Sequence, residues 1–287
     1  MTARILTGKE PAAAQRAEVA ERVTALAADG VSTGLATLLV GDDPASAVYV
    51  GMKHKAAVKA GIESVDRRLG SDVSQGEVDA AVDELNADPN VTAYIVQLPL
   101  PRQLNSDRTL MRIDPSKDAD GLHALNLGRV VLDLPAPRPA TPSGVLRLLD
   151  FYEIGTSGKN VVIVGRSQLV GRPLSIMLSQ KSRNATVTVA HSATKDLVGI
   201  ARSADILIVA AGSPGLIGGE HVAPGAVVVD VGTTKTESGL SGDVRFDEAV
   251  EVASAITPVP GGIGPMTIAG LLANTVALAE AGRDGTM

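Results

Sequence analysis

Short apolar segments alternate with longer helix-like segments along most of this chain. We expect strands at residues 34–40, 63–69, 93–97, 160–164, 186–190, 205–210 and 226–231. The segment 161–164 is apolar at every position, which is typical of a strand covered on both faces. Strands that alternate with helices pair in parallel through helical crossovers. The sequence therefore predicts an α/β fold with parallel sheets.

Residues typical of helix N-termini indicate where several of the intervening helices begin. Asp43 is a suitable N-cap and a proline follows it at the first helical position, so we expect a helix over 44–60. Ser74 and Glu77 have the spacing of a capping box and open another helix. We expect the last helix at 268–281.

The length suggests more than one domain. At roughly 100–200 residues per domain, a chain of 287 residues is expected to form two. Segment 117–142 carries the weakest structural pattern and contains Pro135, Pro137 and Pro139. We interpret it as the passage between the domains.

Charge and cysteine content argue against several classes of protein. The net charge of −6 and the lack of a basic stripe argue against a nucleic-acid partner. With no cysteine, the chain has no disulfide or thiolate metal ligand, which fits a reducing compartment. The N-terminus lacks a signal-peptide h-region, and no apolar run reaches about 18 residues. We therefore expect a cytoplasmic protein with no metal and no membrane partner.

A glycine turn after the strand at 160–164 indicates a dinucleotide. Residues 165–173 continue that strand into a helix, which aims backbone N–H groups and a helix N-terminus at a phosphate. The spacing departs from G-x-G-x-x-G: Ser167 replaces the second glycine and Gly171 comes one residue late. The alternative is an ordinary tight turn between a strand and a helix.

The end of the next strand favours NADP over NAD. An NAD site usually carries an acidic residue there to bind the ribose 2′-hydroxyl. This strand ends instead at Ala190, His191 and Ser192. Arg166 in the glycine turn is suited to a 2′-phosphate, and Ser192 is able to donate a hydrogen bond to it.

Four residues in the first half suggest proton-transfer chemistry on a planar ligand. Tyr49 and Lys53 are four apart and share a helix face, and a buried lysine has a lowered pKa suited to acid–base work. Gln97 ends a strand, where ligands collect in open α/β sheets. Asp120 lies in the acidic loop 117–121. The alternatives are a solvent-facing Tyr–Lys pair and a solvated loop.

The segment 256–267 combines rigid backbone with apolar side chains. It holds three prolines and three glycines in twelve residues. Proline fixes φ, and glycine permits close backbone approach. We expect a tightly folded loop that contacts a ligand; the alternative is a buried turn.

Together these motifs resemble the bifunctional methylenetetrahydrofolate dehydrogenase/methenyltetrahydrofolate cyclohydrolase family, in order and over nearly the whole chain. The motifs are Val40–Ser46 with Tyr49 and Lys53, Val96–Pro101, Asp114–Gly121, Thr141–Gly144, Val164–Ser167, His191-Ser192, Asp230–Gly232 and Ile256–Thr267.

The resemblance implies a role for each site residue. Tyr49 would stack on the folate, and Asp120 would hydrogen-bond the pterin ring. Lys53 would be the central catalytic group, chiefly of the cyclohydrolase step, and Gln97 would hold and tune it. Thr233 would meet the nicotinamide side of NADP. Three residues would cradle the cofactor phosphates: Gly165, Arg166 and Ser167. Three would line a folate cleft: Pro260, Gly261 and Gly262.

The resemblance also implies the organisation of the protein. Residues 1–139 would form a folate-binding catalytic domain, to which the C-terminal helix 268–287 returns. Residues 140–267 would form an NADP-binding, Rossmann-like domain with a doubly wound parallel sheet, and the two domains would flank a cleft. The family commonly forms a homodimer through the cofactor domain and serves one-carbon metabolism, including purine biosynthesis.

Some positions depart from the family, and other functions stay open. Thr233 and Thr234 stand where isoleucine and asparagine are usual, and Gly51 interrupts the helix turn between Tyr49 and Lys53. The alternatives are a monofunctional dehydrogenase, an unrelated NADP dehydrogenase of a small hydroxy or amino acid, and a nucleotide sensor without turnover.

Overall fold

The computed structural model describes residues 3–237 and 239–286, which divide into two compact units. The three-strand unit comprises residues 14–129, 135–140 and 268–286. The six-strand unit comprises residues 3–13, 130–134 and 141–267. Four helices contribute residues to both units: α1 (Lys9–Ala28), α5 (Ala124–Val131), α6 (Ala140–Phe151) and α10 (Ile263–Asp284).

The three-strand unit contains a parallel sheet whose central strand is β2 (Gly34–Val40). It pairs on one side with β3 (Glu63–Leu69) and on the other with β4 (Ala93–Val96). The connection to β3 runs through α2 (Pro44–Lys59), and the connection to β4 runs through α3 (Gln75–Ala87). The chain runs from β2 to β3 on one side and then crosses back from β3 to β4 on the other, so a topological switch point lies at the carboxyl ends of β2 and β4.

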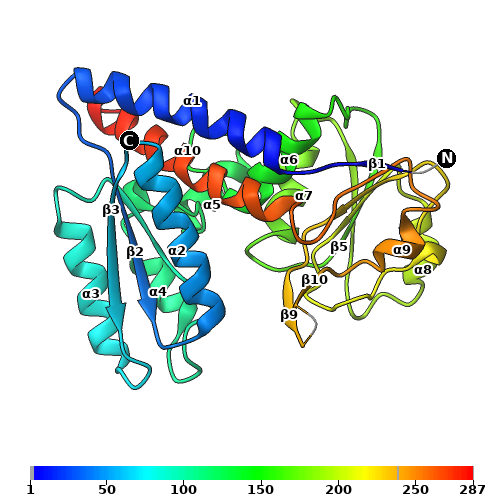
Figure 1. Ribbon diagram of the computed structural model, residues 1–287, viewed down its shortest axis with the longest axis horizontal. Helices are drawn as coiled ribbons and strands as arrows, with labels where there is room; N and C mark the ends of the chain where they lie inside the picture. Colours follow the sequence, from blue (N-terminus) through cyan, green and yellow to red (C-terminus); the bar gives the residue numbers. More distant parts are fainter. Residues whose placement is uncertain (1–2, 238, 287) are drawn as a thin grey trace. The chain divides into compact units, whose positions relative to one another are not determined.

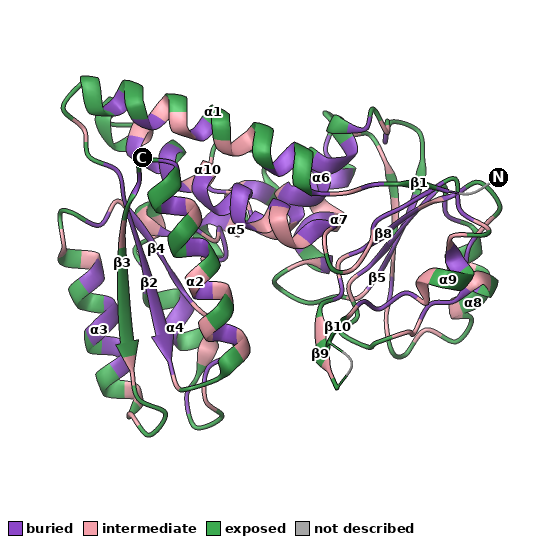
Figure 2. Cartoon of the chain, in the orientation of Figure 1, coloured by how far each residue is buried: buried purple, intermediate pink, exposed green. Residues whose placement is uncertain are grey.

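Both faces of this sheet are covered. Leu35 on one face packs in a core with α1, α2 and α10, whereas Leu38 on the other packs against α3. Among the described residues, α10 is the one helix long and apolar enough to cross a membrane by length and composition. It is instead a core helix, because 61% of its apolar 18-residue stretch is buried inside the protein. Arg22 of α1 pairs with Glu280 of this helix at 2.5 Å. Figure 2 shows this burial.

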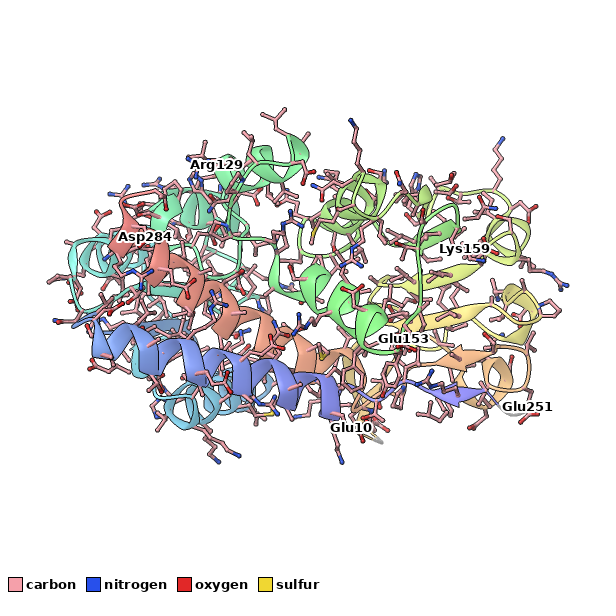
Figure 3. All side chains as sticks on the ribbon, turned by 90° about the horizontal axis from the view of Figure 1, so that it is seen from above. Glu10, Arg129, Glu153, Lys159, Glu251 and Asp284 are labelled. Atoms are coloured by element: carbon pink, nitrogen blue, oxygen red, sulfur yellow. The ribbon has the colours of Figure 1, made fainter. Side chains whose placement is uncertain are left out.

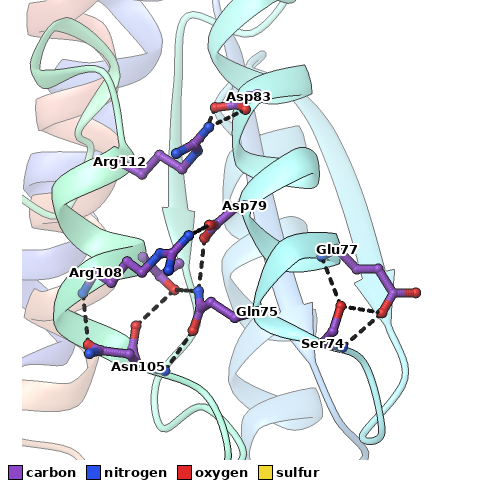
Figure 4. Close-up of polar contacts among 9 residues, drawn as sticks. Ser74, Gln75, Glu77, Asp79, Asp83, Asn105, Arg108 and Arg112 are labelled. Atoms are coloured by element: carbon purple, nitrogen blue, oxygen red, sulfur yellow. Dashed lines mark hydrogen bonds and ion pairs between the residues drawn. The ribbon is translucent and has the colours of Figure 1, made fainter.

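Polar contacts tie α3 to α4 (Ser106–Arg112) on the outer side of this unit (Figure 4). Arg108 pairs with Asp79, and Arg112 with Asp83 at 2.5 Å. The expected capping box at the start of α3 is present: the Ser74 hydroxyl accepts from the Glu77 N–H while the Glu77 carboxylate accepts from the Ser74 N–H.

The six-strand unit holds a fully parallel sheet (Figure 1). The strand order is β1 (Arg4–Ile5), β11 (Ala255–Ile256), β8 (Val227–Asp230), β7 (Ile206–Val209), β5 (Asn160–Val164) and β6 (Thr186–Ala190). The chain leaves β5 for β6 on one side and reaches β7 on the other. The sheet is therefore doubly wound, with its switch point at the carboxyl ends of β5 and β7.

Helices connect these strands. The remaining elements are η1 (Pro115–Lys117) in the three-strand unit and α7 (Gly171–Ser179), α8 (Leu197–Arg202), η2 (Gly219–His221), α9 (Phe246–Ala249) and the antiparallel hairpin of β9 (Thr234–Thr236) and β10 (Gly239–Ser241) in the six-strand unit. The consecutive residues Val161 and Val162 of β5, which point to opposite faces of the sheet, are each 1% exposed, so both faces of this strand are covered as expected. Charged side chains such as Glu153, Lys159 and Glu251 project from the surface (Figure 3).

The sequence predicted the strands well and missed a helix in one connecting region. All seven expected strands form, and three of them end one residue earlier than expected, at Val96, Val209 and Asp230. Segment 117–142, interpreted as the passage between the domains, contains α5 and the start of α6, and boundaries between the two units fall within it. Glycine and β-branched valines in α5 have low helix propensity and conceal it. The last helix begins at Ile263 rather than at residue 268, and β1 and α1 were not predicted.

Gly51 in α2 provides a test of helix stability. A methyl group added there would meet no atom within 4 Å. Because glycine inside a helix costs about 0.5–1 kcal/mol relative to alanine, we expect Gly51→Ala to raise the free energy of unfolding by that amount. Urea unfolding followed by circular dichroism measures it. In the contrasting variant Gly34→Ala, the methyl would lie 2.1 Å from the Asn90 carbonyl oxygen, so stability should fall. A stability loss in Gly51→Ala would contradict the open space seen around it.

Candidate active site

The centre of the site in the three-strand unit is the amine of Lys53. Asp43 caps the start of α2, where its carboxylate accepts from the Ser46 N–H at 2.7 Å. Lys53 lies in the middle of this helix, is 8% exposed, and donates from Nζ to Gln97 Oε1 at 3.0 Å. Tyr49 lies one helical turn earlier and is partly buried. The i,i+4 spacing therefore places the ring and the amine on one helix face.

Hydrogen bonds hold both the backbone and the side chain of Gln97 in place. It follows β4 directly, and its backbone N–H donates to the Leu38 carbonyl at 2.9 Å, which extends the pairing with β2. Its side-chain Nε2 donates to the carbonyl of Leu98 at 2.7 Å. The amide nitrogen is thereby occupied, and Oε1 is presented to Lys53. The Leu98–Pro99 peptide that follows is cis.

The loop that carries Asp120 is organised by Asp118, which is 1% exposed. The Asp118 carboxylate accepts from the backbone N–H groups of Gly121 at 3.0 Å and His123 at 2.8 Å, and from Asn126 Nδ2 at 3.0 Å. Sequence reasoning expected an acidic loop here but missed this role of Asp118. The two carboxylates two residues apart, followed by glycine, were the available signal.

A second support of this loop comes from α10. Asn274 donates from Nδ2 to the carbonyl of Ala119 at 2.8 Å and to that of Arg138 at 2.8 Å. Ala119 in turn donates its N–H to the Tyr94 carbonyl of β4 at 3.2 Å. No sequence pattern pointed to Asn274, because its contacts join segments more than a hundred residues apart.

The charges of Lys53 and Asp120 are coupled. Burial lowers the pKa of Lys53, and the nearby charge of Asp120 partly offsets this. Burial raises the pKa of Asp120, the Lys53 charge lowers it, and the Asp118 charge raises it. The structure thus brings together Lys53, Gln97 and Asp120. An amine that loses its proton more readily than an ordinary lysine, beside a carboxyl that loses its proton less readily than an ordinary aspartic acid, is suited to proton transfer.

In the six-strand unit, the turn after β5 is held by close backbone approach. Gly165 has φ +126°, and a Cβ there would lie 2.1 Å from the carbonyl oxygen of Ala210. A Cβ on Gly171 would lie 2.1 Å from the Gly165 carbonyl oxygen. The irregular glycine spacing therefore still brings the N-terminus of α7 against the end of β5. Val170 at the N-cap supplies no side-chain hydrogen bond, which leaves the N-terminus of α7 without a side-chain cap.

The other predicted cofactor residues lie along the same carboxyl edge. Ser167 accepts from the Val170 N–H at 3.1 Å and shapes the turn. Arg166, Ser192 and Thr233 are all exposed. The nearest carboxylate beyond β6, that of Asp196, caps α8 by accepting from the Gly199 N–H at 2.8 Å. No acidic side chain thus ends β6, as a site for a 2′-phosphate requires.

The Pro/Gly loop belongs to the six-strand unit. Gly8 donates its N–H to the Gly261 carbonyl at 2.8 Å, and a Cβ on Gly8 would lie 1.8 Å from the Gly262 carbonyl oxygen. Gly261 has φ +107°, and Pro260 is exposed. The loop is therefore tightly packed on the N-terminal segment while Pro260 faces outward.

Two family models match consecutive parts of the chain. The description "Tetrahydrofolate dehydrogenase/cyclohydrolase, catalytic domain" matches residues 6–120. The description "Tetrahydrofolate dehydrogenase/cyclohydrolase, NAD(P)-binding domain" matches residues 139–283. Together the two matches cover most of the chain.

Individual relatives agree with the family models. The bifunctional protein FolD of Nitratidesulfovibrio vulgaris is 52% identical over 284 residues, which is 98% of each chain. The crystal structure of a bifunctional FolD from Campylobacter jejuni superposes with a TM-score of 0.92 at 46% identity, covering 96% of this chain and 98% of that one. A Trypanosoma brucei FolD, solved with NADP cofactor and an inhibitor, has a TM-score of 0.93 at 38% identity and covers 99% of both chains.

The close approach at Gly171 predicts a loss of dinucleotide binding. In Gly171→Ala the methyl group collides with backbone, so α7 must move away from β5 and its N-terminus no longer faces the phosphates. We expect NADP affinity, measured by calorimetry, to fall by about tenfold or more. Gly155→Ala in the same unit is the matched control, because its methyl would meet no atom within 4 Å. Equal affinity in the two variants would refute this role of the turn.

Proposed function

Because the chain belongs to the tetrahydrofolate dehydrogenase/cyclohydrolase family, it is a bifunctional NADP-dependent enzyme, and we propose how its residues divide the two reactions. The dehydrogenase oxidises 5,10-methylenetetrahydrofolate to the 5,10-methenyl cation. The cyclohydrolase hydrolyses that cation to 10-formyltetrahydrofolate. The observation that carries the assignment of residues is the buried Lys53–Gln97 hydrogen bond at 3.0 Å beside Asp120.

The first reaction depends mainly on orientation. When bound, NADP supplies the acceptor of the hydride that leaves the methylene carbon. This step needs alignment of donor and acceptor and exclusion of water more than it needs an acid or base. We assign the cofactor phosphates to Gly165, Arg166 and Ser167, the 2′-phosphate to Arg166 with Ser192, and the nicotinamide side to Thr233. The packed glycine turn and the absence of a carboxylate at the end of β6 support this assignment.

The second reaction needs proton transfer. Water attacks the methenyl carbon and loses one proton. As the C–N bond breaks and the ring opens, the departing ring nitrogen gains a proton, and the new hydroxyl loses its remaining proton to solvent to become the formyl C=O, so that one proton is released overall. Lys53 in its neutral form accepts the first proton and, as the ammonium, returns a proton to the departing nitrogen. Its lowered pKa supports this assignment because more of the neutral amine is present at a given pH. Gln97 Oε1 holds the amine in place for both transfers.

The remaining substrate contacts follow from side-chain chemistry. The Tyr49 ring stacks on the flat pterin, and Asp120 hydrogen-bonds the polar edge of the same ring. The pKa of Asp120 is raised by burial, and this favours the protonated carboxyl, the form that is able to donate as well as accept. We assign Pro260, Gly261 and Gly262 to the substrate as well, on the basis of the rigid, glycine-rich backbone of that loop.

The domain assignment is part of this proposal. Residues 1–139 with the C-terminal helix 268–287 form the folate-binding catalytic domain, and residues 140–267 form the NADP-binding domain. The division into two compact units supports it, with residues 3–13 and 130–134 packing in the six-strand unit. We further propose a cytoplasmic homodimer that associates through the cofactor domain. The cysteine-free sequence and the position of β6 at the sheet edge support these two points.

A spectroscopic assay with 5,10-methylenetetrahydrofolate and NADP tests the function. We expect NADPH to form without accumulation of the methenyl product, because both activities act in one protein. Accumulation of methenyl product would reveal a monofunctional dehydrogenase. Absence of NADPH formation would exclude the dehydrogenase, and NADP binding without turnover would indicate a sensor.

Replacement of Lys53 separates the two activities. Lys53→Met removes the proton carrier, so cyclohydrolase activity should fall by about 10² or more, while part of the dehydrogenase activity remains. Rates of methenyl hydrolysis and NADPH formation measure the two effects. Lys55→Met on the exposed side of the same helix is the control and should retain both activities. Equal losses of both activities in Lys53→Met would count against the division of labour.

The lowered pKa of Lys53 predicts a pH effect of Gln97. In Gln97→Glu a carboxylate replaces the amide 3.0 Å from the amine, which stabilises the ammonium and raises the pKa of Lys53. Because the neutral amine is the active base, the rising limb of the cyclohydrolase rate against pH should move to higher pH. The rate at pH 7 should therefore fall, with recovery at alkaline pH. A limb at the wild-type position would show that Lys53 is not the titrating base.

A further inference from the structure

Two buried carboxylates lie near the carboxyl edge of the six-strand sheet. Asp230 is the last residue of β8 and is 3% exposed. Asp243 follows β10 and is 0% exposed. Neither has a part in the roles assigned above, and burial of a carboxylate is costly unless hydrogen bonds compensate it. Their contacts show what they hold in place.

The Asp243 carboxylate holds the loop after β7 through hydrogen bonds. Its Oδ2 accepts from the backbone N–H groups of Ala211 at 2.7 Å and Gly212 at 2.8 Å. These residues directly follow Ala210, whose carbonyl oxygen sets the close approach to Gly165. The Asp243 carboxylate is thus tied to the switch point between β5 and β7, where open α/β sheets bind their ligands.

Asp230 connects Asp243 to the loop after β8 by hydrogen bonds. Its Oδ1 accepts from the N–H of Gly232 at 2.9 Å and from the N–H of Asp243 itself at 3.1 Å. Its Oδ2 accepts from the Val244 N–H at 3.0 Å. The residue after Gly232 is Thr233, which we assign to the nicotinamide side. Two carboxylates therefore fix the loops after β7 and β8 and the segment after β10 relative to one another.

Burial of these two carboxylates costs folding free energy. Burial raises the pKa of Asp230 to about 6, against three backbone donors that lower it, and the neighbouring charge of Asp243 raises it further. Asp243 Oδ1 is buried without a hydrogen-bond partner. A Cβ on Gly232 would lie 2.3 Å from Asp243 Cγ, and a Cβ on Gly242 would lie 2.0 Å from Asp230 Oδ2, so glycines make room for both groups. Costly buried charge of this kind is concentrated at functional sites.

We propose that Asp243, itself held by Asp230, is a positioning residue for hydride transfer, which fixes the loops after β7 and β8 in the shape that receives the nicotinamide half of NADP before the cofactor binds. This inference rests on the proposed assignment of the six-strand unit to NADP. It concerns the nicotinamide half alone, because the glycine turn after β5 and Ser192 serve the phosphates and the adenosine half.

Three variants test the proposal. Asp243→Ala releases Ala211 and Gly212, whereas in Asp243→Asn the amide oxygen still accepts from both N–H groups. Asp205→Ala is the matched control, because Asp205 Oδ2 accepts from the Asn160 N–H at 2.8 Å at the start of β5, on the opposite edge of the same sheet. The measurements are dehydrogenase kcat and KM, the cyclohydrolase rate, and affinity for NADP and for adenosine 2′,5′-bisphosphate, which lacks the nicotinamide half.

We expect Asp243→Ala to lower dehydrogenase kcat/KM for NADP by about 10²-fold, the effect of a misplaced reacting group. Cyclohydrolase rate and adenosine 2′,5′-bisphosphate affinity should stay at the wild-type level, and Asp243→Asn should restore most of the loss. Equal loss of both activities, or wild-type kinetics with NADP, would overturn the proposal. A wild-type enzyme that binds no NADP would instead refute the proposed function.

Hydrogen exchange on the intact wild-type enzyme gives a test that does not depend on folding of a variant. If Asp243 fixes the loop in advance, the amides of Ala211 and Gly212 are protected without NADP and change little when it binds. Free exchange of both amides until NADP is added would overturn the proposal. Protection in both states would support it.

Discussion

In the proposed assignment of roles, the cyclohydrolase chemistry depends on keeping one amine out of water. Lys53 is buried in the three-strand unit and has Gln97 as its hydrogen-bond acceptor. Burial without a full counter-charge lowers the pKa of the amine, and this makes a lysine useful as a base near neutral pH. In that assignment the supports of Gln97 and Asp120 also matter for catalysis, because Gln97 accepts the hydrogen bond of the amine and the charge of Asp120 shifts its pKa.

Both units use the same device to place their functional groups. In each parallel sheet the strand order reverses beside a central strand, and the loops at the resulting switch point carry the candidate site residues. Gln97 follows β4 in one unit, and the glycine turn follows β5 in the other. Loops at a switch point have no ladder partners of their own, so they need other means of support.

Buried aspartates provide much of that support. Asp118 holds the loop that carries Asp120 through two backbone N–H groups and Asn126, and Asp230 and Asp243 hold the loops after β7 and β8. A carboxylate has two oxygens and accepts several hydrogen bonds, so one side chain is able to fix several backbone groups at once. The cost is the burial of charge, seen in the raised pKa of Asp230.

The sequence predicted the strands, the capped start of α2 and the capping box of α3, because hydrophobic periodicity and capping are local properties. It failed at α5, where weak helix formers are stabilised by tertiary packing. It also identified Lys53, Gln97 and Asp120 as candidates, since their residue types and positions after strands or on a helix face are visible in one dimension. By spacing alone it was unable to tell a buried lysine from a solvent-facing one.

The sequence by itself determined the alternation of strands and helices, the residues available for chemistry and the lack of a carboxylate at the end of β6. Only the tertiary structure decided that Lys53 is buried against Gln97, that Asn274 supports the loop of Asp120, and that Asp243 grips the loop after β7. The reason is physical. Burial and hydrogen bonding between distant segments arise from packing of the whole unit, and they set the pKa values and loop shapes that no local pattern records.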